Sequence, residues 1–281
     1  MQTKIIYEDE QVLVCHKPAG LATQSGRVGQ VDMVSELKKY LLSGQRNPMD
    51  GASKSQASKD HEKVMQGAAA KGNATKGDAV KGKTKSVNGK QGNDIYLGII
   101  HRLDQPVEGL LVFAKTKEAA AKLTAQLAKG SLNKQYYAIV CGKPIAESGE
   151  LVDYLLKEKD VARVSEKGVD DKEAKKAVLQ YKQLSTTMTE VSDEKQVVSL
   201  LDIHIDTGRF HQIRVQMSHA GLPLLGDSKY GSEKSQEISK KLGIRNVALY
   251  AYRLEFVHPT TGKKLEFQIE PKLPCGFGNI S

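Results

Sequence analysis

Residues 98–116 read GIIHRLDQPVEGLLVFAKT and place a charged tetrad, His101-Arg102-Leu103-Asp104, between two apolar runs. The apolar runs are residues 99–100 before the tetrad and 110–113 after it. Short apolar runs bounded by turn residues are typical of buried strands. Three ionisable side chains at the junction of two such strands favour one of two interpretations. The junction is either an ordinary turn that contains Asp104 or the loop of an active site.

Length and composition limit the class of protein to which the chain can belong. Its 281 residues are 39% hydrophobic and 27% charged, which allows one large or two small globular domains with an ample core. No run reaches the roughly 18 apolar residues that span a bilayer, and the first ten residues, MQTKIIYEDE, contain no apolar signal segment. Cys15, Cys141 and Cys275 match neither a disulfide framework nor a CxxC metal site, so we expect a cytoplasmic protein with reduced thiols. The net charge of +9 favours an anionic partner, nucleic acid first.

Residues 45–94 differ in composition from everything around them. They contain no Leu, Ile, Phe or Tyr, and they carry ten Lys or Arg against five Asp or Glu. Such a segment cannot bury enough apolar surface to offset the entropy lost on ordering it. We therefore predict a flexible, low-complexity basic insertion. Two interpretations of it stay open, a spacer and a weak electrostatic tether for RNA phosphates.

Outside the insertion, local patterns predict short strands and a few helices. Asp32 and Thr116 stand where they can cap two helices, and Gly44 and Gly130 stand where these helices end. A third helix is predicted over 210–220. The predicted strands cover residues 4–7, 11–15, 110–113, 136–140, 201–205, 254–257 and 265–269, the last two as a hairpin. Many strands, few helices and hairpin signals predict an α+β fold with a mixed, largely antiparallel sheet and flanking helices.

Four clusters of charged and polar residues stand out, and each has an ordinary explanation by itself. Asp104 fits a turn, Arg214 fits an exposed helix face, and Tyr136 fits a core aromatic whose hydroxyl is hydrogen-bonded. The clusters are HRLD at 101–104, Lys134 with Tyr136, TGRFHQIR at 207–214, and GDxKYG at 226–231.

Taken together and in this order, the clusters resemble the RluA-type RNA pseudouridine synthases, whose central motif is HRLD. The resemblance covers residues 4–42 and 95–273. It rests on five ordered motifs, which are far more specific than any one of them. These are YEDEQVLVCHKPAG, HRLDQPVEGLLVFAKT, NKQYYAIVCG, LLDIHIDTGRFHQIRVQMSHAGLPLLGDSKYG and LYAYRLEFVHPTTGKKLEF.

The resemblance implies an enzyme that converts specific uridines of ribosomal or transfer RNA to pseudouridine. Such an enzyme breaks the N-glycosidic bond, turns the uracil and rejoins it through carbon 5, without a metal or any other cofactor. The implied fold is a single pseudouridine synthase domain over residues 1–275, with a central RNA-binding cleft, interrupted by 45–94. No S4-type RNA-binding domain is expected in front of it, because the first predicted strand begins near residue 4. We expect a monomer that does not bind membranes.

The resemblance also assigns roles to residues. Asp104 matches the catalytic aspartate, Tyr136 the tyrosine that packs on the target base and is implicated in proton handling, and Arg214 the arginine that pairs with the aspartate. Arg102 matches the motif arginine that helps to displace the base from its stack. Contacts with RNA are expected from His101, Arg102, Lys134, Arg209, His211 and Gln212.

The residue types suit these roles. A stacked uridine must be flipped out before it can react, at a cost of a few kcal/mol. A reactive carboxylate must stay ionised in a partly dry pocket, and an adjacent arginine opposes the upward pKa shift that desolvation causes. An aromatic face beneath the uracil supplies stacking and excludes water.

The motif departs from the family pattern at Val107-Glu108, where Thr-Ser is usual, and at Gln216, where histidine is common. We expect Glu108 to point away from Asp104, because two facing carboxylates would repel each other. The departure leaves room for a second reading, an RNA-binding protein of the same fold that has lost catalysis. A third reading is a metal-dependent hydrolase that uses histidines, although their spacing matches no known metal motif. Those histidines are His101, His204, His211 and His219.

Overall fold

The computed structural model describes residues 1–26, 29–44, 95–191, 193–274 and 277. The predicted insertion at 45–94 lies outside the described residues, so its interpretation stays a prediction. Residues 1–45 and 95–281 belong to one compact unit, and the fold below is that of the described residues of this unit. None of its helices is both long enough and apolar enough to cross a membrane.

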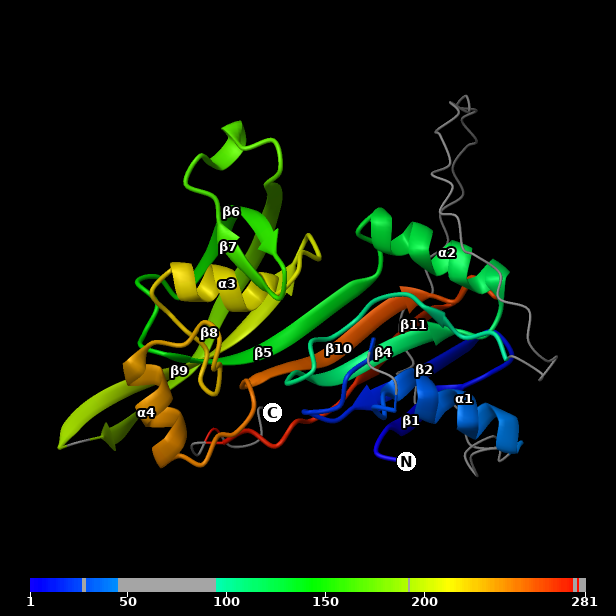
Figure 1. Ribbon diagram of the computed structural model, residues 1–281, viewed down its shortest axis with the longest axis horizontal. Helices are drawn as coiled ribbons and strands as arrows, with labels where there is room; N and C mark the ends of the chain where they lie inside the picture. Colours follow the sequence, from blue (N-terminus) through cyan, green and yellow to red (C-terminus); the bar gives the residue numbers. More distant parts are fainter. Residues whose placement is uncertain (27–28, 45–94, 192, 275–276, 278–281) are drawn as a thin grey trace, which may run out of the picture. The chain divides into compact units, whose positions relative to one another are not determined.

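The described strands form one twisted sheet (Figure 1). Its order is β1-β2-β4-β10-β5-β9-β8-β6-β7, with β3 paired to β4 and β11 paired to β10. Every pairing is antiparallel except that of β4 with β10, so the sheet is mixed and largely antiparallel, as predicted. The strands are β1 Lys4–Glu8, β2 Val12–Lys17, β3 Gly98–Ile99, β4 Glu108–Ala114, β5 Asn133–Cys141, β6 Ser148–Glu158, β7 Val161–Val164, β8 Lys175–Val191, β9 Glu194–Ile205, β10 Leu249–Val257 and β11 Lys264–Gln268.

The helices begin and end at residues that favour helix termini. The carboxylate of Asp32 accepts the N–H of Ser35, and the hydroxyl of Thr116 accepts the N–H of Ala119, so both predicted caps are confirmed. Gly44 and Gly130 adopt the left-handed conformation that follows many helices. The helices are α1 Met33–Ser43, α2 Lys117–Ala128, α3 Gln212–His219 and α4 Glu233–Lys241, with a 3₁₀ turn η1 at Gly168–Asp170.

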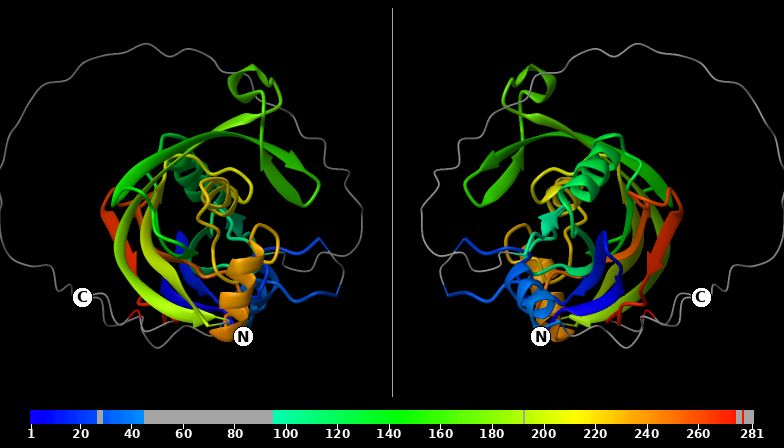
Figure 2. Two further views of the ribbon diagram at one scale, coloured as in Figure 1. Left: turned by 90° about the vertical axis from the view of Figure 1, so that its left-hand side faces the viewer. Right: turned by 90° about the vertical axis from the view of Figure 1, so that its right-hand side faces the viewer.

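Alternate residues of the central strands face opposite sides of the sheet and form separate cores. In β4, Leu111 and Phe113 join the core that includes residues of α1 and α3. Leu110 and Val112 face the other side, where α2 packs. In the end-on views of Figure 2 the strands of this unit form a curved wall. Tyr136 of β5 and Leu103 lie in the core shared with α1 and α3, which places the HRLD loop on that side.

The parallel contact between β4 and β10 fixes the end of the HRLD loop. Gly109 pairs with Ala251 across this contact, and its φ of 142° is one that L side chains rarely adopt. A Cβ at position 109 would lie 2.5 Å from the Cβ and backbone oxygen of Ala251. Only glycine fits this close approach between the two strands.

We expect Gly109→Ala to lower the free energy of unfolding by about 3 kcal/mol or more, through backbone strain and overpacking. The measurement is urea unfolding followed by circular dichroism. Gly130→Ala is the matched control, because it has a positive φ of 70° but open space around its Cβ position. A Gly109→Ala variant no less stable than Gly130→Ala would contradict this reading of the β4–β10 contact.

Candidate active site

The loop between β3 and β4 carries the HRLD tetrad, and the segment after β2 holds it in place. The Thr23 hydroxyl donates to the Leu103 carbonyl at 2.9 Å and accepts the Leu103 N–H at 3.3 Å. The N–H of Gly20 donates to the Gln105 carbonyl at 2.9 Å. Asp104 is therefore flanked on both sides by backbone groups that are pinned to residues far away in the sequence. This favours an active-site loop over an ordinary turn.

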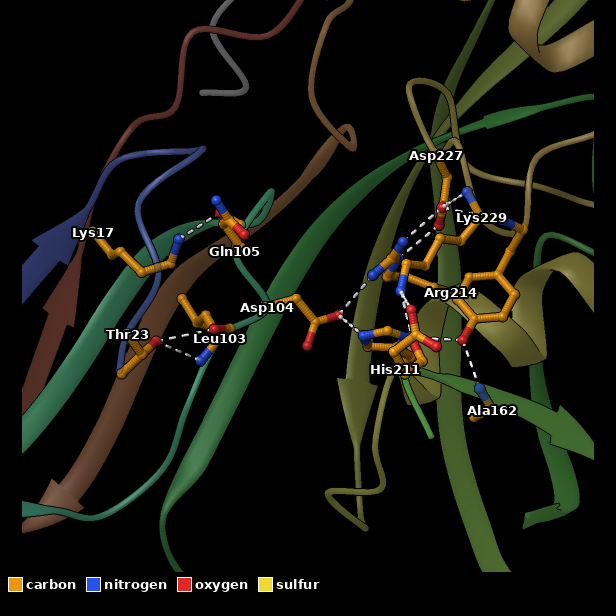
Figure 3. A network of polar contacts seen from close by, with 12 residues as sticks. Lys17, Thr23, Leu103, Asp104, Gln105, Ala162, His211, Arg214, Asp227 and Lys229 are labelled. Atoms are coloured by element: carbon orange, nitrogen blue, oxygen red, sulfur yellow. Dashed lines mark hydrogen bonds and ion pairs between the residues drawn. The ribbon is translucent and has the colours of Figure 1, made fainter. Parts of the chain in front are cut away.

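Lys17 joins the same two segments from inside the protein (Figure 3). Its side chain is fully buried, and its ammonium donates to the carbonyls of Pro18, Leu21 and Gln105 at 2.6–3.1 Å. Three acceptors match the three N–H groups of an ammonium. Burial lowers the pKa of Lys17 to about 8, against the opposing effect of the negative charges on Asp104 and Glu108. Lys17 thus ties the turn after β2 to the residue that follows Asp104.

Asp104 lies opposite Arg214 of α3. Arg214 Nη1 donates to Asp104 Oδ2 at 3.1 Å, while Nε and Nη2 donate to the two carboxylate oxygens of Asp227 at 2.7 Å. The side chains of Arg214 and Asp227 are buried, whereas 25% of the Asp104 side chain is exposed. Burial alone would lower the pKa of Arg214, but the pairing with Asp227 and Asp104 outweighs it and raises that pKa. Arg214 is therefore a fixed positive charge that Asp227 orients toward Asp104.

The two side-chain contacts of Asp104 converge on one oxygen (Figure 3). Arg214 Nη1 and His211 Nε2 lie 3.1 and 3.6 Å from Oδ2. Among the described residues, none donates a hydrogen bond to Oδ1. One oxygen of a partly exposed carboxylate is thus held by cationic and polar groups while the other is available to a ligand.

His211 and Tyr230 form a second chain of contacts behind Oδ2. His211 Nδ1 lies 2.7 Å from the Tyr230 hydroxyl, which accepts the N–H of Ala162 in β7 at 2.7 Å. The His211 side chain is 8% exposed, and burial lowers its pKa to about 4. The imidazole is therefore neutral at physiological pH.

Tyr136 of β5 is buried in the core on the Asp104 side of the sheet, with 5% of the residue exposed. Burial raises the pKa of its phenol, and the negative charge of Asp104 raises it further. The phenol is therefore protonated at physiological pH. It offers an apolar ring and an O–H group, but no phenolate.

The residues predicted to contact RNA differ in how exposed they are. Arg102 and Arg209 are exposed. Lys134 is largely buried, and burial lowers its pKa to about 8. His101 and Gln212 are inside the protein, where His101 Nε2 accepts the N–H of Val112 and the Gln212 amide contacts three residues of its own chain. Direct RNA contact is not favoured by the burial of His101 and Gln212. The Gln212 amide is engaged within the fold, whereas Nδ1 of His101 has no hydrogen-bond partner among the described residues.

The two departures from the family pattern take part in other contacts. Glu108 pairs with His16 Nε2 of β2 at 2.9 Å, which agrees with the expectation that it turns to a partner other than Asp104. Val107 is buried in the core, and its N–H donates to the Asp104 carbonyl. Gln216 is fully buried and donates to the Asp153 carboxylate at 2.9 Å. None of these contacts removes Asp104 or Arg214 from the site.

The histidines of the hydrolase reading lie in separate contacts. His204 pairs with Asp206, His219 with Asp153, and His101 with the backbone of Val112. Within the described ranges, no three His, Cys, Asp or Glu side chains are grouped as a metal ion requires. This geometry gives the hydrolase reading no support.

A cavity of about 390 Å³ shares Tyr230 with the site. Cys141 and Gly142 from the end of β5 and Lys234 from α4 also line it, and Asp104 does not. The cavity thus does not include the Asp104 carboxylate. The central RNA-binding cleft expected from the sequence stays a prediction.

Four residues of the site were given no role from the sequence, namely Lys17, Thr23, Asp227 and Tyr230, although the last two belong to the GDxKYG cluster. Lys17 and Asp227 belong to quoted motifs, KPAG and GDxKYG, and a buried charge in a motif is a signal of a structural partner. Tyr230 also belongs to the GDxKYG motif, but a tyrosine is a weaker signal because it is uncharged at neutral pH. Thr23 carried none, because a single threonine in a loop is common.

The sequence matches a family model and several named relatives. The sequence model described as RNA pseudouridylate synthase matches residues 11–219. The ribosomal large subunit pseudouridine synthase D of Zymomonas mobilis is 30% identical over 269 residues, which cover 95% of this chain and 68% of that protein. The tRNA pseudouridine synthase C of Haemophilus ducreyi is 37% identical over 170 residues, which cover 59% of this chain and 69% of that protein.

Solved structures resemble the fold. The human RNA pseudouridylate synthase domain containing 1 superposes with a TM-score of 0.62 at 17% identity, covering 96% of this chain and 83% of that one. The human RNA pseudouridylate synthase domain containing 4 gives a TM-score of 0.60 at 21% identity, covering 96% and 88%. At these identities the likeness concerns the fold alone.

Proposed function

Because the chain belongs to the RNA pseudouridylate synthase family and is an enzyme that converts uridine in RNA to pseudouridine, we propose that Asp104 is its reactive carboxylate. The observation that carries this assignment is the asymmetry of the Asp104 carboxylate. Arg214 holds Oδ2 at 3.1 Å, and no described residue donates a hydrogen bond to Oδ1. A carboxylate held by one oxygen presents the other in a defined direction, as a nucleophile or a base requires.

The overall reaction is an isomerisation and consumes no co-reactant. The bond from N1 of uracil to C1′ of the ribose breaks, and a bond from C5 to C1′ forms. The hydrogen on C5 leaves as a proton, and N1 gains a proton, so the step is balanced without an oxidant or a reductant. Oδ1 of Asp104 attacks the nucleotide or takes its proton, and the positive charge of Arg214 stabilises the carboxylate when the site is closed to water.

Tyr136 serves in this proposal as the wall of the uracil site. Its raised pKa keeps the phenol protonated, so it acts through its ring face and as an O–H donor rather than as a phenolate base. Stacking of a base on an aromatic ring contributes about 1–3 kcal/mol. That stabilisation partly offsets the cost of taking the uridine out of its stack.

Contact with the RNA backbone is assigned to the exposed cations. Arg102 precedes Asp104 by two residues and is exposed, so it can enter the space that the flipped base leaves. Arg209 is exposed at the start of the TGRFHQIR segment, and its Nε donates to the Lys176 carbonyl, which holds the guanidinium against β8. Lys134 is largely buried, so it contributes positive charge from beneath the surface, and with a pKa of about 8 this charge weakens as the pH rises past that value.

The proposal also covers the RNA substrate, the oligomeric state and the cellular compartment. The relatives described above are named for ribosomal and for transfer RNA, so we take a uridine in one of these RNAs as the target. The resemblance to the family implies a monomer, and the proposed roles of Asp104 and Arg214 call on no residue of a second copy. Cys15 and Cys141 are free thiols inside the protein, which suits the cytoplasm.

The reading as a lapsed RNA-binding protein rested on Val107-Glu108. The loop is held instead by Thr23, Lys17 and Gly20, and Glu108 is engaged by His16. With the loop braced and Asp104, Tyr136 and Arg214 present, the geometry favours an active enzyme.

The test is tritium release from RNA labelled at C5 of uridine, with ribosomal and transfer RNA as separate substrates. We expect stoichiometric release from one of them, unchanged when EDTA is present. Tight binding to both RNAs without release from either would contradict catalysis and favour the lapsed-enzyme reading.

A further inference from the structure

His211 has an unusual place at the start of α3. It precedes the helix in the left-handed conformation, with a φ of 54°, which few residues other than glycine adopt. Its ring stacks on Phe210 with centroids 3.8 Å apart and meets the ring of Tyr230 edge-on at 5.5 Å. These contacts leave the imidazole one orientation. Its Nε2 faces Asp104 (Figure 3), and its Nδ1 lies 2.7 Å from the Tyr230 hydroxyl.

The partners of Tyr230 decide which nitrogen of His211 carries the proton. The Tyr230 oxygen already accepts the N–H of Ala162 at 2.7 Å, so its own O–H is free to be donated. At 2.7 Å the acceptor for this O–H is Nδ1 of His211. A neutral imidazole that accepts at Nδ1 carries its hydrogen on Nε2. That hydrogen points at the Asp104 carboxylate, which can only accept.

We propose that His211 is a positioning residue for Asp104, in which a neutral Nε2–H holds Oδ2 beside Arg214 and the Tyr230 hydroxyl fixes the tautomer. The inference rests on the proposed role of Asp104. The present separation of 3.6 Å is longer than a hydrogen bond. Contacts of catalytic groups are often long before substrate binds and shorten in the complex, so the Nε2–H bond forms when RNA closes the site.

The charges around His211 explain why a neutral donor is needed. Arg214 and Lys229 face it as cations, while Asp104, Asp227 and Asp160 face it as anions. Burial, the largest cause, and the two cations together lower the pKa of His211 to about 4, against the opposing effect of the carboxylates. A second cation on Oδ2 would bind the carboxylate more tightly and reduce its reactivity. A neutral N–H fixes the same oxygen without that penalty.

The β6–β7 hairpin is part of this arrangement. Its backbone supplies the Ala162 N–H, Asp160 in its turn accepts the ammonium of Lys229, and Lys157 lies over the ring of Phe210 at 4.7 Å. The hairpin thus supports both rings that hold His211. The chain of contacts runs from β7 through Tyr230 and His211 to Asp104.

A pair of substitutions separates positioning from folding. His211→Asn keeps a residue that tolerates the left-handed conformation and an amide near the place of Nδ1, but it cannot reach Asp104. His211→Gln is one carbon longer and carries an N–H donor near the place of Nε2. We expect His211→Asn to lower the single-turnover rate constant by about 10- to 100-fold, with the Kd for RNA within about threefold of wild type. His211→Gln is expected to recover about tenfold of that loss.

Tyr230→Phe tests the tautomer through the pH profile. Without the Tyr230 O–H, no group donates to Nδ1, so its protonation becomes easier and the pKa of His211 rises above the wild-type value of about 4, although burial still holds it below the ordinary histidine value. We expect the single-turnover rate of Tyr230→Phe to fall as the pH is lowered from about 7 to 5, whereas the wild-type rate changes little over this range. A purely structural role of Tyr230 would lower the rate equally at every pH.

The outcomes distinguish this inference from the assignment of Asp104. If Asp104→Asn is inactive while His211→Asn matches wild type, the positioning role is wrong and the reactive carboxylate stands. If the pH profiles of Tyr230→Phe and wild type superimpose, the tautomer assignment is wrong. If Asp104→Asn retains activity, the proposed function itself fails.

Discussion

Replacing Asp104 by asparagine is expected to lower the rate of pseudouridine formation by a factor of roughly 10⁴ or more, the scale seen when a reactive group is removed. Asparagine has nearly the shape of aspartate, and its oxygen can still accept the N–H of Arg214. It lacks the negative charge and the nucleophilic or basic oxygen that the reaction requires. The measurement is single-turnover tritium release from uridine-labelled RNA at saturating enzyme.

Folding and binding should change little in this variant. Asp104 is partly exposed, and the loop around it is held by Thr23 and Lys17 rather than by its own carboxylate. We expect a Kd for RNA within about threefold of wild type and a Tm within about 2 °C. Asp170→Asn, at an exposed position in η1, is the matched control and should keep full activity. An Asp104→Asn variant with more than a tenth of the wild-type rate would contradict the assignment of Asp104.

The sequence predicted those elements whose local pattern is strong. Alternation in residues 201–205 and 265–269, and caps such as Asp32 and Thr116, correspond to β9, β11, α1 and α2. The start of α3 was placed two residues too early, because the left-handed backbone of His211 cannot be recognised from residue type. Local pattern is informative where one face of an element is buried and the other is not.

The elements β6, β7, β8 and α4 were not predicted, and their composition explains why. The second half of β8 reads QLSTTMTEV, and most of its residues are exposed or half-buried. Its strand character comes from pairing with β9 rather than from a buried face. Helix α4, EKSQEISKK, contains Ile238 as its only apolar residue, so its sequence shows no stripe of apolar residues that would mark a buried helix face.

The site was predicted only in part, because successive side chains of the HRLD loop point in different directions. Neighbours in the HRLD tetrad alternate, with His101 and Leu103 inward and Arg102 outward. Residues next to Asp104 in sequence therefore do not all lie in its site, and the RNA contact of His101 stays a prediction that its burial does not favour. The GDxKYG cluster drew attention to Asp227, but its pairing with Arg214 is a tertiary contact that no local pattern reports.

The removal of Asp227 is expected to have the largest effect on stability. Asp227 is fully buried and binds Arg214 through both of its oxygens at 2.7 Å. In Asp227→Ala the guanidinium stays buried with one of its two partners lost. Breaking one side of a buried pair costs about 3–5 kcal/mol, which corresponds to a fall in Tm of roughly 10 °C for a domain of this size. Activity should fall by about 10²–10³-fold as well, because Arg214 is no longer oriented toward Oδ2.

A double variant separates these two consequences. Asp227→Ala with Arg214→Met removes both charges and leaves an apolar side chain of similar length in the buried space. Replacing both members of a buried pair is often neutral or stabilising, so we expect most of the lost Tm to return. It should stay somewhat below the wild-type Tm, because the N–H groups of Lys229 and Tyr230 still lack Asp227 Oδ1 as their acceptor. Activity should not return, because Oδ2 of Asp104 has lost its cationic partner. A double variant that is stable and active would show that Arg214 and Asp227 serve the fold alone, and one as unstable as Asp227→Ala would show that the cost does not arise from the unpaired guanidinium.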